Sequence, residues 1–310
     1  MRTVPTTIAM VMALGFVPAC KKDEAKTDDT KADAKSDDEG KGEGDDGEPT
    51  LQVAEGQDAV DGPVPPETSM VFYVVEGALL PLGCFDKDGG KMAVGDACLK
   101  MAPTGEEARL SSVDSAFNRP LGEPAEPHCL AGSGRNVAVG VEGITESANF
   151  KYAAWPPSAL KIVKWVPEET TSPRATRLSD DETEKLLAAA RRQGGRGDEL
   201  RAHQIAEIDV HDDGKRDKVY AVFIPHPTLS EQYNWSGIFW AKDGDLDDLV
   251  LLEQSRTKRD VFEVRGALDL NGDKTNELWL RLVFAEGGGD KLVQIEGGKP
   301  KSLGAWTCGV

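Results

Sequence analysis

Short runs of apolar residues, separated by glycine, proline and acidic clusters, recur along the chain from about residue 50 onward. The clearest runs are MVFYVV at 70–75, NVAVGV at 136–141 and LKIVKWV at 160–166. They are rich in the β-branched and aromatic residues that strands favour, and the glycine and proline clusters between them are typical of turns. The pattern therefore predicts a mainly β protein.

One segment, LSDDETEKLLAAARRQGG at 178–195, has helical spacing instead. Ser179 can cap the helix, Glu182 stands three residues later as the partner in a capping box, and Gly194 follows the last turn. The apolar face that we expect toward the core consists of Leu186, Leu187 and Ala190. The polar stretch before this helix predicts a boundary between a β region at 50–170 and a second half at 171–310.

The second half contains a repeat. EIDVHDDGKRDKVYAV at 207–222 matches ALDLNGDKTNELWLRL at 267–282, at a separation of 60 residues. Each copy is an acidic turn that runs into a strand, and we name residues 209–217 the first acidic loop and residues 269–277 the second acidic loop. With the strands YAVFI, GIFWA and LVLLE between them, a period of this length suits one propeller-like blade per repeat.

The acidic loops place oxygen-bearing side chains at alternate positions, a spacing that directs carboxylates toward a hard cation such as calcium. The candidate ligands in the second loop are Asp269, Asn271, Asp273, Glu277 and the carbonyl of Thr275, and those in the first loop are Asp209, Asp213 and Asp217. The alternative is a pair of Asx turns with local hydrogen bonds and no metal.

In these residues the chain resembles the FG-GAP and VCBS family of β-propeller repeats, over roughly residues 200–290. The resemblance implies propeller-like repeats with calcium as a structural cofactor, so the expected fold is an antiparallel β region followed by incomplete propeller-like repeats. The sequence departs from the family pattern at Lys274, where glycine is usual, and at His211, where an aspartate or asparagine ligand is usual. The second loop is therefore the stronger calcium candidate.

The N-terminus has the features of an export signal. An apolar stretch at 8–17, too short to span a bilayer, precedes Val17-Pro18-Ala19-Cys20. This segment resembles the lipobox of bacterial lipoproteins, which implies removal of residues 1–19, a diacylglycerol on Cys20 and usually an acyl chain as well, such as palmitate, on the new amine. A plain secretory signal cleaved near Ala19, or an uncleaved start, are the alternatives.

The segment after Cys20 is strongly charged. Residues 21–48 hold twelve acidic and six basic residues and no aromatic one, so residues 20–49 are predicted to form a disordered tether. The whole chain carries a formal charge of −18, which is the wrong sign for neutralising phosphates. These features predict attachment to a bacterial membrane through lipid, on the periplasmic or outer face, and no nucleic-acid partner.

If Cys20 carries lipid, four of the five cysteines remain, and an exported chain would oxidise them to disulfides. The candidates are Cys84, Cys98, Cys129 and Cys308. Cys84 with Cys98 is favoured because GCFDKDGGKMAVGDACL predicts a hairpin. Cys129 with Cys308 follows by elimination.

No motif for a nucleophile elbow, a zinc protease, a P-loop or a dinucleotide site occurs, so we expect no enzymatic activity. The sequence predicts an exported, noncatalytic binding or scaffolding protein with an envelope protein or glycan as partner. Two alternatives stay open: a carbohydrate or peptidoglycan binder that stacks sugars on Tyr233 and Trp235, and a hydrolase whose acid pair is assembled in space.

Overall fold

The structure is a computed structural model, and it describes residues 67–75, 78–112, 115–124, 139–141, 150–230, 232–284 and 287–309. By its contacts the chain divides into two units, residues 1–58 and 59–310, and every described residue belongs to the second. The predicted signal, Cys20, the tether and Cys129 lie outside the described residues, as does the side chain of Cys308.

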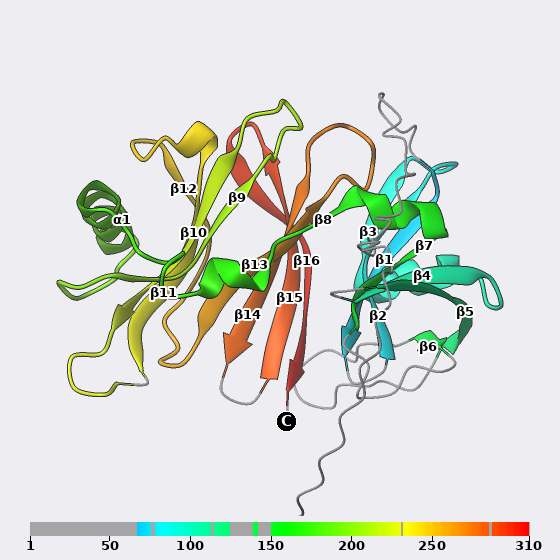
Figure 1. The fold of residues 1–310 in the computed structure, drawn as a ribbon, viewed down its shortest axis with the longest axis horizontal. Helices are drawn as coiled ribbons and strands as arrows, with labels where there is room; N and C mark the ends of the chain where they lie inside the picture. Colours follow the sequence, from blue (N-terminus) through cyan, green and yellow to red (C-terminus); the bar gives the residue numbers. More distant parts are fainter. Residues whose placement is uncertain are drawn as a thin grey trace, which may run out of the picture. The chain divides into compact units, whose positions relative to one another are not determined.

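The N-terminal part of the second unit is an antiparallel sheet of seven strands (Figure 1). The strands are β1 Ser69–Val75, β2 Ala78–Asp86, β3 Lys91–Val94, β4 Glu107–Ser112, β5 Ala116–Pro124, β6 Val139–Val141 and β7 Phe150–Trp155. Their order is β1-β7-β4-β5-β6-β2-β3, and β1 also pairs with β2, so six of the strands close on themselves. The strand predicted at 70–75 is confirmed.

The disulfide between Cys84 and Cys98 is present, as predicted. Cys84 lies in β2, and Cys98 lies in the 3₁₀ helix η1, Gly95–Met101, with 5.7 Å between the two Cα atoms. Strands β2 and β3 form the expected hairpin, and in its turn the Asp88 amide donates to Asp86 Oδ1 at 3.1 Å. The bridge therefore fixes η1 against the hairpin that precedes it.

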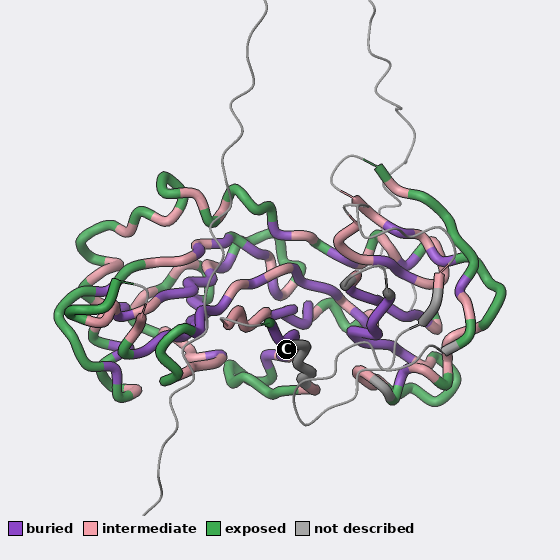
Figure 2. The backbone as a smooth tube through the Cα atoms, turned by 90° about the horizontal axis from the view of Figure 1, so that it is seen from below, coloured by how far each residue is buried: buried purple, intermediate pink, exposed green. Residues whose placement is uncertain are grey.

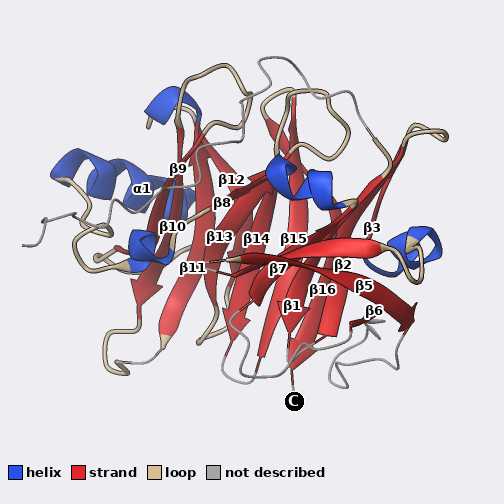
Figure 3. Ribbon diagram, turned by 45° about the vertical axis from the view of Figure 1, so that its right-hand side comes forward, coloured by secondary structure: helices blue, strands red, loops and turns tan. Residues whose placement is uncertain are grey.

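Two further antiparallel sheets follow, each built on a four-strand meander (Figure 3). The first meander consists of β9 Arg201–Ile208, β10 Asp217–Pro225, β11 Tyr233–Ala241 and β12 Leu249–Ser255. The second consists of β13 Val261–Leu268, β14 Glu277–Phe284, β15 Gly287–Glu296 and β16 Lys299–Gly309. The described residues thus form a mainly β fold of three sheets, with no closed propeller.

The fifth strand of the last sheet comes from the N-terminal half of the chain. Strand β8, Val163–Trp165, pairs with β13, although it precedes the predicted boundary near residue 170. The prediction of a strand over the whole of 160–166 is wrong, because residues Pro157–Ile162 form the 3₁₀ helix η2. Two other 3₁₀ turns are η3 Glu168–Thr171 and η4 Lys242–Gly244.

Helix α1, Asp180–Arg192, has the predicted capping box: the Glu182 amide donates to Ser179 Oγ at 3.2 Å, and the Ser179 amide donates to Glu182 Oε2 at 2.9 Å. Leu186 and Ala190 are buried, and they pack against apolar side chains of β10 and β11. The helix covers the face of the first meander that points away from the second (Figure 1).

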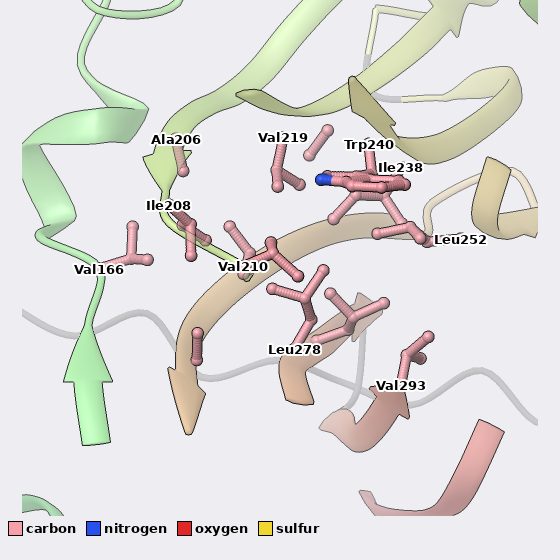
Figure 4. Close-up of a cluster of buried hydrophobic side chains, with 14 of the residues drawn as sticks. Val166, Ala206, Ile208, Val210, Val219, Ile238, Trp240, Leu252, Leu278 and Val293 are labelled. Atoms are coloured by element: carbon pink, nitrogen blue, oxygen red, sulfur yellow. The ribbon is translucent and has the colours of Figure 1, made fainter. Parts of the chain in front are cut away.

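The main core lies between the two meanders. In Figure 4, Val219, Ile238 and Trp240 of the first meander face Leu278 and Val293 of the second. Side chains alternate along each strand, so Leu278 and Leu280 enter this core whereas Trp279 points to the opposite face and packs with Val71 and Leu82 of the N-terminal sheet. Buried residues accordingly follow the strands, and most exposed residues lie in the connections (Figure 2).

Candidate functional site

The two acidic loops occupy equivalent places in the two meanders: the first joins β9 to β10, and the second joins β13 to β14. They share one hydrogen-bond pattern. Asp209 Oδ1 and Oδ2 accept the amides of Asp213 and Gly214 at 3.1 and 2.9 Å. In the second loop Asp269 accepts the amides of Asp273 and Lys274 at 3.1 and 3.0 Å. The repeat seen in the sequence is thus a repeat of local structure.

The backbone of the two loops agrees as well. The fourth and sixth positions are left-handed in both loops, with φ of 49° and 81° at Asp212 and Gly214, and 70° and 67° at Gly272 and Lys274. Left-handed backbone is strained for residues with a Cβ. Each loop therefore has glycine at one of the two positions and a strained residue at the other.

Asn276 joins the two loops to each other. Its amide Nδ2 donates to the carbonyls of Asp209 and Val210 at 2.9 and 3.2 Å, and its backbone amide donates to the Val210 carbonyl at 2.7 Å. Asn276 is fully buried, and its Oδ1 has no hydrogen-bond partner among the described residues. The two loops therefore form one continuous site at the same end of the meanders.

The acid that closes each loop is where the loops differ. Asp217 is 3% exposed, and both its oxygens accept backbone amides: Val210 at 3.4 Å and Asp243 at 2.7 Å. Glu277 is 0% exposed; its Oε2 accepts the Leu270 amide at 3.1 Å, but its Oε1 has no partner among the described residues. Only the second loop leaves a buried carboxylate oxygen unsatisfied.

The pKa values of the acids in the second loop are consistent with an unsatisfied closing acid there. The pKa of Glu277 is raised to about 8, mainly by burial and also by the negative charges of Asp273 and Asp269, and the hydrogen bond from the Leu270 amide only partly opposes this rise. Burial also raises the pKa of Asp269, against the hydrogen bond from the Lys274 amide. Three carboxyl groups, those of Asp269, Asp273 and Glu277, thus interact electrostatically in the second loop, and the pKa values of Asp269 and Glu277 are raised.

The third loop position separates the two copies too. Asn271 stays within the second loop: its Nδ2 donates to Asp273 Oδ2 at 2.9 Å, and its Oδ1 accepts the Asp273 amide at 3.1 Å. The His211 ring instead lies edge-on to the Trp240 ring, with 5.8 Å between centroids. The first loop therefore offers no side-chain oxygen at this position.

Calcium requires several oxygens that converge on one point. Among the described residues, no group of three or more His, Cys, Asp or Glu side chains has an arrangement that could hold a metal ion. In the second loop the side chains of Asp269 and Asp273 accept backbone amides, as when Asp273 Oδ1 accepts the Thr275 amide at 2.7 Å. The oxygen donors of the second loop are of the type that calcium prefers, and Glu277 Oε1 has no described partner. The carboxylates of the loop, however, do not converge on one point in this structure.

The predicted sugar-stacking residues need a correction. Trp235 is 0% exposed: its ring packs in the core beneath α1, close to Phe239, and its Nε1 donates to Gln254 Oε1 at 2.9 Å. The order Trp235, Ser236, Gly237 does not reveal that Trp235 is buried, because apolar cores cover both faces of β11. Tyr233 is half-buried, with its ring 4.5 Å from that of Phe223, so no aromatic platform is formed by the pair.

A charged network that the sequence did not indicate connects β9 with the second meander. Glu263 accepts from His203 Nε2 at 3.0 Å and lies 3.2 Å from Arg265 Nη2. Burial opposes ionisation of Glu263, yet the hydrogen bond from His203 and the charge of Arg265 keep its pKa below the ordinary value. Glu263 and Arg265 are neighbours on β13, but His203 lies 60 residues earlier in the chain, and only the packing of the two sheets brings it to Glu263.

Comparisons with family models, with curated proteins and with solved structures each return no match to this chain. In the parts that the structure describes, no helix combines the length and the apolar character that crossing a membrane requires.

Proposed function

We propose that this chain is an exported, lipid-anchored and noncatalytic envelope protein, in which the second acidic loop binds a structural calcium ion. In this proposal its two meanders are propeller-like repeats. The observation that carries it is the buried, unpartnered Oε1 of Glu277, a carboxyl that interacts electrostatically with Asp269 and Asp273 in a loop whose geometry is duplicated 60 residues earlier.

A divalent cation would satisfy what the protein leaves unsatisfied. A buried carboxylate oxygen without a partner is costly, and like charges beside it increase the cost. Calcium bound by Asp269, Asn271, Asp273, Glu277 and the Thr275 carbonyl would supply a positive partner for each of them. The first loop needs no such ion, because backbone amides already occupy both oxygens of Asp217.

The expected effect on stability is small. At millimolar calcium and the affinities of about 10⁻⁴ to 10⁻³ M that extracellular calcium modules have, binding contributes about 0.4 to 1.4 kcal/mol. Such an ion holds loops in place, so this function is structural.

The test is the melting temperature of the full chain in a chelator and after calcium is restored. We expect the melting temperature to rise with calcium, and Asp273→Ala and Glu277→Gln to abolish the rise. Asp213→Ala is the matched control, because Asp213 Oδ1 accepts the Lys215 amide at 2.9 Å just as Asp273 Oδ1 accepts that of Thr275. A melting temperature that does not change with calcium would refute the calcium site. A rise that persists in both Asp273→Ala and Glu277→Gln would refute it as well.

The anchor is tested separately. The lipobox pattern, the charged segment after it and the bridge between Cys84 and Cys98 all support export. Mass spectrometry of the exported protein should show a chain that begins at Cys20 and carries a diacylglycerol, and Cys20→Ser should abolish the modification. An unlipidated product that begins elsewhere would eliminate the anchor and leave the calcium test unaffected.

A further inference from the structure

The structure assigns a second site to this chain: a cleft at the C-terminal end of α1 that binds the oxyanion of a small ligand, a phosphate or carboxylate group, between Arg196 and Arg256. The cleft has a volume of about 470 Å³ and is lined by Gly194, Arg196, Asn234 and Arg256. This volume lies in the range of roughly 300–1,000 Å³ that small-molecule sites have, and the lining is polar, which suits an ion.

Three parts of the first meander bring these residues together. Gly194 and Arg196 lie in the connection from α1 to β9, Asn234 lies at the start of β11, and Arg256 follows β12. The meander topology places all three segments at the end opposite the first acidic loop. The cleft is therefore independent of the proposed calcium site.

The backbone that carries Arg196 is held firmly. Asn234 Nδ2 donates to the Arg196 carbonyl at 3.1 Å, and Arg191 donates to the next carbonyl, that of Gly197, at 2.8 Å from Nη2. The Arg196 side chain is exposed, and it has no hydrogen bond or ion pair with any described residue. One positive charge is thus presented to the cleft on a fixed backbone and without a carboxylate of its own.

Gly194 leaves the space that the Arg256 guanidinium occupies. A Cβ at Gly194 would lie 2.7 Å from Arg256 Nη2, and the φ of +89° at this residue also favours glycine. Arg256 Nη2 donates to the Gln193 carbonyl at 3.4 Å, at the end of α1. A guanidinium has five N–H donors, so most donors of Arg256 remain for a ligand.

Neither Arg196 nor Arg256 forms an ion pair with a described residue, and both line one cleft in a chain that carries a formal charge of −18. An acidic surface repels anions in general, so a local pair of guanidiniums is the place where an anion can still bind. The planar fork of arginine matches the paired oxygens of phosphate and carboxylate groups. The amide of Asn234 adds a polar group to the same wall.

The experiment is isothermal titration calorimetry of the full-length protein in non-ionic detergent with two probes, inorganic phosphate and succinate. The buffer is free of calcium, because calcium phosphate would precipitate. We expect one probe to bind saturably below about 10 mM, an affinity that a few charge-assisted hydrogen bonds provide. Tighter binding of phosphate assigns the cleft to phosphate esters, and tighter binding of succinate assigns it to carboxylates.

The variants locate the binding. Arg196→Gln should weaken binding about tenfold or more, since each charge-assisted hydrogen bond that is lost costs at least this factor. Arg196→Lys should recover only part of the affinity, because an ammonium does not bind two oxygens at once. Arg256→Gln should weaken binding too, but it also removes a contact with the end of α1, so the decisive variant is Arg196→Gln.

Arg192→Gln is the matched control: Arg192 is an exposed arginine at the same end of α1 that makes no ion pair with a described residue and does not line the cleft. It should leave the affinity unchanged. Absence of saturable binding by both probes overturns the inference, and so does equal binding by the wild type and Arg196→Gln. Neither outcome bears on the calcium response, which involves other residues.

Discussion

The first and second acidic loops have the same backbone and the same aspartate-to-amide hydrogen bonds, yet they differ in how the closing acid is satisfied. Asp217 in the first loop has two backbone donors, whereas Glu277 in the second has one. The repeated sequence therefore sets the conformation of both loops, whereas the connections around them determine whether the protein itself satisfies both oxygens of the closing acid.

The extra donor in the first loop comes from a longer connection. Residues 242–248 link β11 to β12, and from this segment the Asp243 amide reaches Asp217 Oδ1 at 2.7 Å. The corresponding connection of the second meander, between β15 and β16, is the two-residue turn Gly297-Gly298. No described donor from this turn reaches Glu277. A length difference far from the motif therefore leaves one carboxylate oxygen free.

The largest effect is expected at the closing acid of the first loop. Asp217→Asn places an amide group against one of two buried backbone donors, and a buried donor without an acceptor costs about 1 to 3 kcal/mol. We expect a loss of about 2 to 3 kcal/mol in the free energy of unfolding, with or without calcium. Urea unfolding measures it. A loss of the same size from Glu277→Gln in chelator would contradict the asymmetry between the loops.

The next effect concerns Glu182, which links α1 to Lys218 and Tyr220 of β10 in the first meander. Burial raises the pKa of Glu182, but hydrogen bonds from the Ser179 amide, the Tyr220 hydroxyl and Lys218 outweigh burial and lower the pKa to about 2. A carboxyl with a lowered folded-state pKa stabilises the fold above its unfolded-state value near 4.5, and this stability is lost as the pH falls from there toward 2.

We therefore expect Glu182→Gln to cost about 1 to 2 kcal/mol at pH 7 and progressively less below pH 4.5. Glutamine can keep the capping box, so the pH-dependent part reports the charge. The measurement is the difference in unfolding free energy between wild type and variant from pH 7 to pH 2.5. If the difference did not change with pH, the carboxylate of Glu182 would not be a source of stability.

The sequence was sufficient for the features that depend on neighbouring residues. The capping box at Ser179 and Glu182, the hairpin around Asp88 and the duplicated loops follow from local spacing, because a cap, a tight turn or an Asx turn involves few residues.

Features set by distant elements could not be read in this way. Trp235 is buried because α1 covers the second face of its sheet, and nothing near residue 235 indicates that cover. Strand β8 joins a sheet about 100 residues further along the chain, where it pairs with β13. The order of the strands also brings the Asp243 amide to Asp217 and places Arg196 and Arg256 on the wall of one cleft.

A smaller effect distinguishes the strained positions of the two loops. Lys274 has a φ of 67° where the first loop has Gly214 at 81°. Lys274→Gly removes strain of about 1 kcal/mol but adds flexibility to the unfolded chain, so we expect a net gain of about 0.5 kcal/mol in the free energy of unfolding.

Gly214→Ala should lower the free energy of unfolding by about 1 kcal/mol from backbone strain alone, because a Cβ there meets no atom within 4 Å. Chemical unfolding in chelator checks both signs, and a loss of stability from Lys274→Gly would show that the side chain contributes more than its backbone costs.

The smallest effect is expected from restoring an oxygen at the third position of the first loop. His211→Asn removes a ring contact with Trp240 and should cost only about 0.5 kcal/mol. It should confer no response to calcium, because both oxygens of Asp217 would still accept the amides of Val210 and Asp243. The measurement is a calcium titration of the melting temperature in the Glu277→Gln background, in which the second loop is expected to give no calcium response. A rise in that background would mean that the third position, and not the closing acid, decides which of the two loops takes an ion.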